Sequence, residues 1–229
     1  MHTQRHLKTA VLLSGGGSTL ANLLECRRLD GLPIDIELVI SSRPNAGGLR
    51  IAADAGIRTA VVNSRDFVSP GRTAEEINHW GDMSREVDKL LIPGEYDLVL
   101  MAGYLSRYVI PDELYGRVLN IHPSLIPMFC GDGMYGLKVH HAVVQSGVKI
   151  TGCTVHFANN KYDAGPIILQ RACPVYCHDL PKDVQARVFK EECKAYPAAI
   201  RLFVDERIHL DEVTSRVFID DEGKEDIWR

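Results

Sequence analysis

Three polar side chains of the sequence could together stabilise a developing negative charge and move a proton. Asn120 and His122 stand two residues apart at the end of the apolar run VLNIH, and Asp163 follows a later apolar run. On an extended chain, side chains two residues apart project to the same side. An amide and an imidazole can donate hydrogen bonds to a charged oxygen, and a carboxylate can hold a water that relays a proton. This set predicts an active site.

The apolar runs that must position these side chains have the rhythm of an open α/β sheet. Strands are expected at residues 9–13, 36–40, 59–62, 98–101, 118–122, 149–157 and 167–175. Helices are expected at 20–29, 49–55, 73–91 and 139–145, with a last one capped by residues 179–181 and ending near 203. Two short strands follow in the tail. Strands that alternate with helices predict a mostly parallel sheet with right-handed crossovers, whose ligands bind beyond the strand ends.

A glycine-rich loop, SGGGST at residues 14–19, joins the first expected strand to the first helix. Such a loop brings backbone N–H groups close to an anion, and the helix N-terminus adds partial positive charge. A Walker loop would need a lysine, which is missing, and the dinucleotide fingerprint would need a glycine where Leu20 stands. The remaining interpretations are a cradle for a phosphate monoester and a glycine turn without a ligand.

Composition narrows the classes of partner. The chain has 229 residues and a formal net charge of −4, which suits one globular domain and gives no electrostatic case for nucleic acid or an anionic membrane. No apolar run approaches the roughly 20 residues that span a bilayer, and the polar start resembles no secretory signal. We therefore expect a cytoplasmic protein with small-molecule partners, and six reduced cysteines rather than a metal site.

Four motifs in register carry a resemblance to a known family. NIHPSLIP, SGGGS, GCTVHF and DAGPIILQ occur in the same order and with nearly the same spacing as in the folate-dependent phosphoribosylglycinamide formyltransferases, over residues 9–204. The resemblance implies a Rossmann-like formyltransferase fold in a single domain, residues 1–229. Within it, a phosphate-binding half of about 9–102 would be followed by a catalytic and folate-binding half of about 103–204 and a tail of 205–229.

The resemblance also implies a reaction and a set of site residues. The family transfers a formyl group from 10-formyltetrahydrofolate, a co-substrate, to the amine of glycinamide ribonucleotide, without a metal, and a homodimer is left open. By analogy, the catalytic residues are Asn120, His122 and Asp163. The phosphate is held by Gly15, Gly16, Gly17, Ser18, Thr19 and Arg72, with Glu192 near the nucleotide. Folate contacts Tyr104, Leu105, Ala158, Asn159 and Asp163. Supporting residues are His140, His156 and Thr154, the last of which would help to order a water, although the two histidines could equally belong to the scaffold.

The chain departs from the family pattern at several positions. Gly16 stands where asparagine is common, and Cys193 replaces a common histidine. The region 63–94 is longer than usual, so Arg85 rivals Arg72 as the phosphate-binding arginine. Residues 131–136 form a glycine-rich insertion that we expect to border the active site. None of these departures touches the three predicted catalytic residues.

Rival functions share part of this pattern. Formyltetrahydrofolate hydrolase uses water as the acceptor but carries an extra N-terminal domain and lacks the glycine loop. Methionyl-tRNA formyltransferase carries an added C-terminal domain and needs a basic surface. A sugar-nucleotide formyltransferase is harder to exclude. From a different class, a nucleotide-binding regulatory module without catalysis stays open, because fold does not fix function.

Overall fold

The computed structural model describes residues 5–67, 79–211 and 213–220. The chain forms two compact units, Met1–Leu119 and Asn120–Arg229. The catalytic side chains predicted from the sequence all belong to the second unit, whereas the glycine loop belongs to the first. The predicted single domain, and its division into a phosphate-binding and a catalytic half, stay predictions.

The first unit is built on parallel strands. Its strands are β1 (Leu7–Leu13), β2 (Ile34–Ser41), β3 (Arg58–Val61) and β4 (Leu98–Met101), and its helices are α1 (Ser18–Asp30), α2 (Gly47–Asp54) and α3 (His79–Leu91). Short 3-10 turns lie at Ser64–Phe67, Ile92–Gly94 and Asp112–Leu114. β1 pairs in parallel with β2 and β4, and β2 pairs in parallel with β3. Residues 10–13 of β1 are fully buried, as expected for a central parallel strand that is apolar on both faces.

The helix expected at 73–91 is described from His79 onward. Residues 73–78 lie outside the described residues. Met83, Val87 and Leu91 are buried. This helix therefore presents an apolar side to the core of the first unit.

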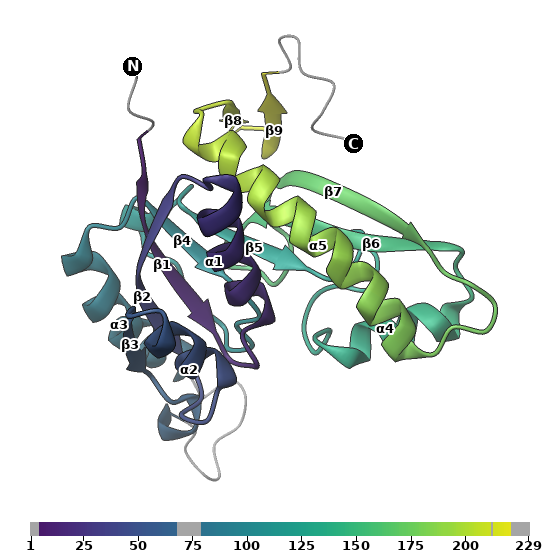
Figure 1. The fold of residues 1–229 in the computed structure, drawn as a ribbon, viewed down its shortest axis with the longest axis horizontal. Coiled ribbons are helices and arrows are strands. Elements are labelled where there is room, and N and C mark those ends of the chain that lie inside the picture. Colours follow the sequence, from purple (N-terminus) through teal and green to yellow (C-terminus); the bar gives the residue numbers. More distant parts are fainter. Residues whose placement is uncertain (1–4, 68–78, 212, 221–229) are drawn as a thin grey trace. The chain divides into compact units, whose positions relative to one another are not determined.

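The second unit combines a β ribbon with two helices. Its elements are β5 (Val118–His122, which crosses from the first unit), α4 (Leu137–Ser146), β6 (Ile150–Phe157), β7 (Ile167–Pro174), α5 (Pro181–Val204), β8 (Ile208–Asp211) and β9 (Arg216–Ile219). β6 and β7 are antiparallel, as are β8 and β9. α5 packs against β6, β7 and α4, and Figure 1 shows it lying along the ribbon. Pro197 lies inside α5 without ending it, and its side chain is buried.

Among the described residues, seven strands form one sheet in the order β3-β2-β1-β4-β5-β6-β7, and β8 and β9 form a second sheet. An open, mostly parallel sheet with flanking helices and a C-terminal β tail confirms the predicted fold class. The position of β1, between β2 and β4, places the loop after β1 where the strand order changes direction. Such a change of direction is where open α/β sheets bind their ligands.

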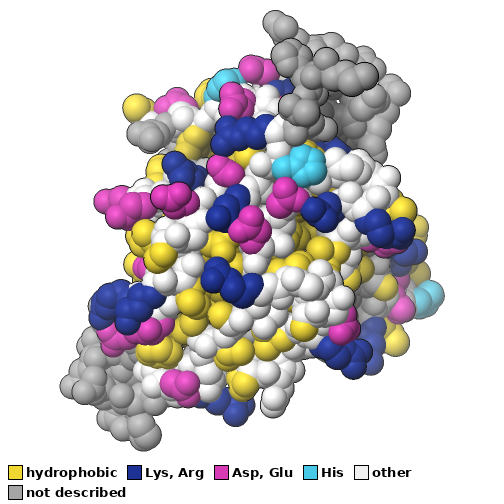
Figure 2. All heavy atoms as spheres, turned by 60° about the vertical axis from the view of Figure 1, so that its left-hand side comes forward, with side chains coloured by type: hydrophobic (Ala, Val, Ile, Leu, Met, Phe, Trp, Pro, Cys, Tyr) yellow, Lys and Arg dark blue, Asp and Glu magenta, His cyan; other side chains and the backbone are white. Residues whose placement is uncertain are grey.

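The surface carries charges of both signs. Figure 2 shows a face on which Lys and Arg side chains are interspersed with Asp and Glu side chains. Within the described part of the chain, no helix is both long and apolar enough to cross a membrane.

Candidate active site

Asn120, His122 and Asp163 come together in the second unit. Asn120 and His122 lie on β5, and Asp163 lies in the loop between β6 and β7. His122 Nδ1 is 3.4 Å from Asp163 Oδ2, and the Asn120 amide donates to Asp163 Oδ1 at 3.5 Å. The side chains of His122 and Asp163 are only 5% and 11% exposed, so water screens their interaction weakly. As predicted from strand periodicity, Asn120 and His122 approach the same carboxylate.

The loop after β5 fixes the carboxylate of Asp163. The backbone N–H of Gly131 donates to Asp163 Oδ2 at 2.9 Å. Asp163 itself has φ 49°, in the left-handed region that aspartate enters more readily than most residues. The carboxylate is therefore held from two sides, by its own backbone conformation and by the backbone amide of Gly131, the first residue of the predicted insertion.

The ring of His122 lies between two acceptors. Its Nε2 is 2.9 Å from the carbonyl oxygen of Phe129, and because a carbonyl can only accept, this nitrogen carries a proton. Its Nδ1 faces the Asp163 carboxylate. A ring with both nitrogens protonated can donate to both acceptors, which is the form that could donate a charged hydrogen bond to a substrate oxygen.

His156 orients the amide of Asn120. Its Nδ1 donates to the carbonyl of Phe157 at 2.8 Å, which leaves Nε2 as an acceptor for the Asn120 amide at 3.0 Å. Burial lowers the pKa of His156, which favours this neutral form. The geometry gives His156 a positioning role, because it determines which way the Asn120 amide points.

The hydroxyl of Thr154 ties the loop after β5 to the ribbon. It donates to the carbonyl of Ser124 at 2.7 Å and accepts from the backbone N–H of Ile126 and from the Gln170 amide, both at 3.0 Å. One proton and two lone pairs are thus all used within the protein. The resemblance implies that Thr154 helps to order a water. For this, the water would have to replace one of the three partners of the hydroxyl.

Replacing this hydroxyl is expected to destabilise the fold. Thr154→Val should lower the free energy of unfolding by about 2 to 3 kcal/mol, because it leaves the buried carbonyl of Ser124 and the partly buried N–H of Ile126 without their partner. Thr151→Val is a matched control, since the buried hydroxyl of Thr151 has no partner among the described residues and should cost less than about 1 kcal/mol. Urea denaturation measures the free energy of unfolding of both variants. Equal losses of stability would contradict the role of the Thr154 hydroxyl in holding the loop after β5.

His140, on α4, is a second buried imidazole near His122. Its Nδ1 has no hydrogen-bond partner among the described residues. Burial, with a smaller contribution from the nearby His122, lowers the pKa of His140 from 6.5 to about 4. The ring is therefore neutral at neutral pH and can accept or donate one hydrogen bond toward a ligand.

A depressed histidine pKa makes stability depend on pH. Between pH 6.5 and about 4 the unfolded chain binds a proton at His140 that the folded chain does not, so stability falls as the pH falls through that window. The expected contribution is about 3 kcal/mol. Between pH 6.5 and about 4, the denaturation midpoint of His140→Gln should therefore change less with pH than that of the wild type. His141→Gln, at an exposed neighbouring position, is the control. Parallel slopes for the wild type and His140→Gln would contradict the assignment.

Glu192 differs from its neighbour Glu191 on α5. The Glu191 carboxylate pairs with Arg171 at 2.8 Å and with Lys194 at 2.9 Å. Burial raises the pKa of Glu192 to about 7. Some of the Glu192 surface is still accessible, so a polar ligand could reach it.

The glycine loop of the first unit has the geometry of an anion cradle. A Cβ built on Gly15 or Gly16 would meet nothing within 4 Å, so their backbone is open. Gly17 has φ 82°, and its Cβ would lie 2.5 Å from the Cα of Gly48. Ser18 and Thr19 begin α1, whose first backbone N–H groups are available to an anion.

The close contact at Gly17 is expected to tolerate no side chain. Gly17→Ala should lower the free energy of unfolding by about 1 to 2 kcal/mol from the left-handed backbone alone, and by more once the clash with Gly48 is added. It should also raise the KM for a phosphorylated substrate more than that for its co-substrate. Gly15→Ala, at an open position, should keep the wild-type stability in the same thermal melts. Equal melting temperatures for the two variants would refute this account.

The remaining predicted binding residues are distributed over both units. Arg72 lies outside the described residues, and its rival Arg85 is exposed and pairs with Asp82. Tyr104 is buried, its hydroxyl has no partner among the described residues, and burial raises its pKa. The backbone N–H of Leu105 donates to Ser14 Oγ at 2.8 Å. In the second unit, Ala158 and Asn159 follow β6.

Sequence reasoning did not identify the main-chain groups of the site. Every residue type has a backbone carbonyl and almost every type has a backbone N–H, so the sequence could not indicate that Phe129 and Gly131 contribute theirs. The expectation that residues 131–136 border the active site gave the only indication. Gln170, which supports Thr154, was likewise not singled out. Among the residues that the structure describes, no three side chains of metal-ligating type form a cluster, and all six cysteines are free.

Comparisons with known proteins point to one family. The sequence profile of the formyl transferase family matches residues 7–200. The chain is 36% identical over 216 residues to the chloroplastic phosphoribosylglycinamide formyltransferase of Arabidopsis thaliana, covering 90% of this chain and 68% of that protein. It is 32% identical to the Escherichia coli phosphoribosylglycinamide formyltransferase, covering 90% and 91%. The crystal structure of glycinamide ribonucleotide transformylase 1 from Symbiobacterium toebii superposes with a TM-score of 0.78 at 35% identity, covering 94% and 95%.

Proposed function

Because the chain belongs to the formyl transferase family, among its phosphoribosylglycinamide formyltransferases, we propose that Asn120, His122 and Asp163 carry out its reaction. The reaction transfers a formyl group from 10-formyltetrahydrofolate to the amine of glycinamide ribonucleotide, a step of purine biosynthesis. The observation that carries the assignment of residues is the approach of the Asn120 amide and the His122 ring to one weakly exposed carboxylate.

The chemistry assigns a task to each of the three groups. As the amine nitrogen bonds to the formyl carbon, negative charge develops on the formyl oxygen, and the Asn120 N–H and a protonated His122 can donate to it. The amine must lose a proton, which Asp163 can accept through a water. When the bond from the formyl carbon to the folate nitrogen breaks, that nitrogen takes up a proton, which Asp163 can return through the water. His122 can take part once its Nε2 exchanges the Phe129 carbonyl for a substrate oxygen, or through Nδ1.

The experiment that tests the function separates transfer from its rivals. Purified protein is mixed with a formylfolate, with and without glycinamide ribonucleotide, and deformylated folate is followed by absorbance. Release that requires the ribonucleotide is the expected result. Release without it would identify a hydrolase, and no release under either condition would favour a binding module. A sugar nucleotide tested in place of the ribonucleotide covers the remaining formyltransferase alternative.

The site residues for each substrate form part of the same proposal. Gly15, Gly16, Gly17, Ser18 and Thr19 would hold the phosphate, Glu192 would lie near the nucleotide, and folate would contact Tyr104, Leu105, Ala158, Asn159 and Asp163. Support for the phosphate assignment comes from the open backbone of Gly15 and Gly16 at the start of α1. Catalysis without a metal, a cytoplasmic location and a homodimer remain predictions, the last of which native mass spectrometry would decide.

A further inference from the structure

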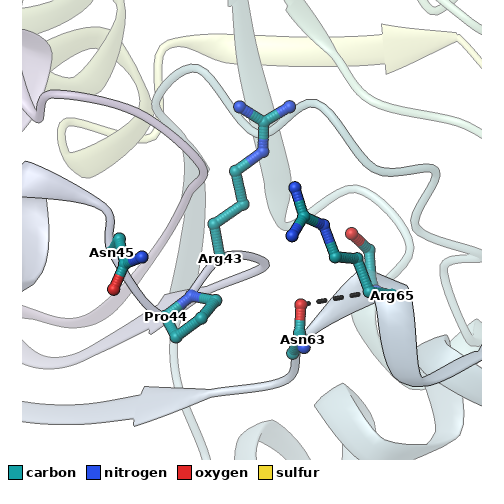
Figure 3. A pocket seen from close by; sticks show the side chains of 6 residues that line it. Arg43, Pro44, Asn45, Asn63 and Arg65 are labelled. Carbon is teal, nitrogen blue, oxygen red and sulfur yellow. Dashed lines mark hydrogen bonds between the residues drawn. The ribbon is translucent and has the colours of Figure 1, made fainter.

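We propose that Arg43 and Arg65 form a binding site for a phosphate-type dianion in the first unit. The two arginines line a pocket of about 300 Å³ between the loops that follow β2 and β3, together with Pro44, Asn45, Asn63 and Ser64. Figure 3 shows the Arg43 and Arg65 side chains extending in the same direction from these neighbouring loops. Neither residue was singled out by the sequence.

The charges of the two guanidinium groups are not neutralised within the described residues. Arg27, Arg171 and Arg187 each pair with a carboxylate, at distances of 2.5 to 2.8 Å. Among the residues that the structure describes, Arg43 and Arg65 have no such partner, and both are exposed. Two guanidinium groups on one side of a pocket favour an anion, since each can bind phosphate through two parallel hydrogen bonds.

The polar groups around the arginines strengthen this preference. Asn63 holds the second loop, because its Oδ1 accepts from the Arg65 N–H at 3.3 Å and its amide donates to Asp66 at 2.9 Å. Within the described residues, the Asp66 carboxylate forms no ion pair with either arginine. The Asn45 amide and the Ser64 hydroxyl form no side-chain hydrogen bonds within the described part of the chain, and both can donate to a ligand.

The pocket lies beside the glycine loop, at the carboxyl ends of parallel strands. Ser42, at the end of β2, is 2.5 Å from Ser14 between their hydroxyl oxygens, and its carbonyl accepts from the Ser64 N–H at 3.1 Å. The Gly48 N–H donates to the carbonyl of Gly15 at 3.2 Å. The loops after β1, β2 and β3 are therefore tied together, in the region where open α/β sheets bind their ligands.

Two sources of the dianion fit this chemistry. One is the phosphate of the ribonucleotide substrate, if it reaches past the glycine loop; the other is a separate phosphate-bearing molecule. A pocket of about 300 Å³ is at the small end of ligand sites, with room for a phosphate and a small attached group. The anion site does not depend on the proposed reaction, but the identity of its ligand does.

Phosphate titration of the full chain tests the site without any activity measurement. The side-chain Nε–Hε signals of ¹⁵N-labelled protein are assigned by their loss in Arg43→Gln and Arg65→Gln. Both signals are expected to shift with added inorganic phosphate, and each substitution should weaken the response of the other arginine at least about tenfold. Arg28, exposed on α1, is the matched control, and its signal should not move. Signals of Arg43 and Arg65 that stay fixed, or move only together with that of Arg28, would overturn the proposal.

Steady-state kinetics then distinguish the two sources. If the site takes the substrate phosphate, Arg43→Gln and Arg65→Gln raise the KM for the ribonucleotide about tenfold and leave that for folate unchanged. If the site takes a separate molecule, Arg43→Gln and Arg65→Gln lose the NMR response to phosphate, while their KM values for the ribonucleotide and for folate equal those of Arg28→Gln. Either result supports the dianion site and names its source.

Discussion

Asp163→Asn is expected to lower kcat by about 10²- to 10³-fold while the protein keeps its fold. The substitution keeps the shape of the side chain and an oxygen for the Gly131 N–H, but it removes the negative charge that faces His122. It also removes the group that could accept the proton of the amine. The KM for the ribonucleotide should change little, because the predicted phosphate cradle belongs to other residues.

Asp132→Asn provides the matched control. Asp132 is exposed and follows Gly131 directly in the loop after β5, so this variant removes an equal charge next to the residue that holds Asp163, without changing Asp163 itself. Asp163→Asn and Asp132→Asn should therefore have the same melting temperature and the same KM values, and only kcat should differ between them. If both variants turn over at the wild-type rate, Asp163 has no part in the chemistry.

His122→Gln is expected to lower kcat by a similar factor, about 10²- to 10³-fold. Glutamine can still donate a hydrogen bond, but it cannot carry the positive charge that strengthens a bond to a developing oxyanion. The effect should appear in kcat and in kcat/KM alike, since the interaction forms in the transition state.

The control for this variant is His141→Gln, an exposed histidine of α4. Its kinetic constants should match those of the wild type. Nucleotide binding by His122→Gln, measured by calorimetry, should also be unchanged, which a loss of folding would not allow. Weakened binding together with a lowered melting temperature would point to a structural role for His122 instead.

The fold could be predicted from local patterns. The apolar runs of β1, β2 and β4 are long enough and buried enough to appear as strands in any context, and each is followed by turn residues or a helix. The predicted start of the third helix, at residue 73, lies outside the described residues and stays a prediction. The continuation of α5 beyond Pro197 is not expected from local helix propensity, since proline in a helix interior removes a hydrogen bond.

The site was predictable where it depends on strand geometry and unpredictable where it depends on long-range contacts. The spacing of Asn120 and His122 placed both on one side of β5. The contact of His156 with Asn120 joins residues 36 positions apart, and no local pattern carries that information. The same holds for the three partners of the Thr154 hydroxyl, which lie 16 to 30 positions away along the chain.

The segment from Phe129 to Gly131 offers a template for inhibitor design. It presents a carbonyl oxygen to His122 and an N–H to Asp163, one acceptor and one donor two residues apart. A small molecule with the same acceptor and donor pair could displace this segment and occupy both predicted catalytic groups at once. Because Gly131 begins the predicted insertion, an extended compound would also reach residues 131–136, where a difference from other members of the family would be a physical basis for selectivity.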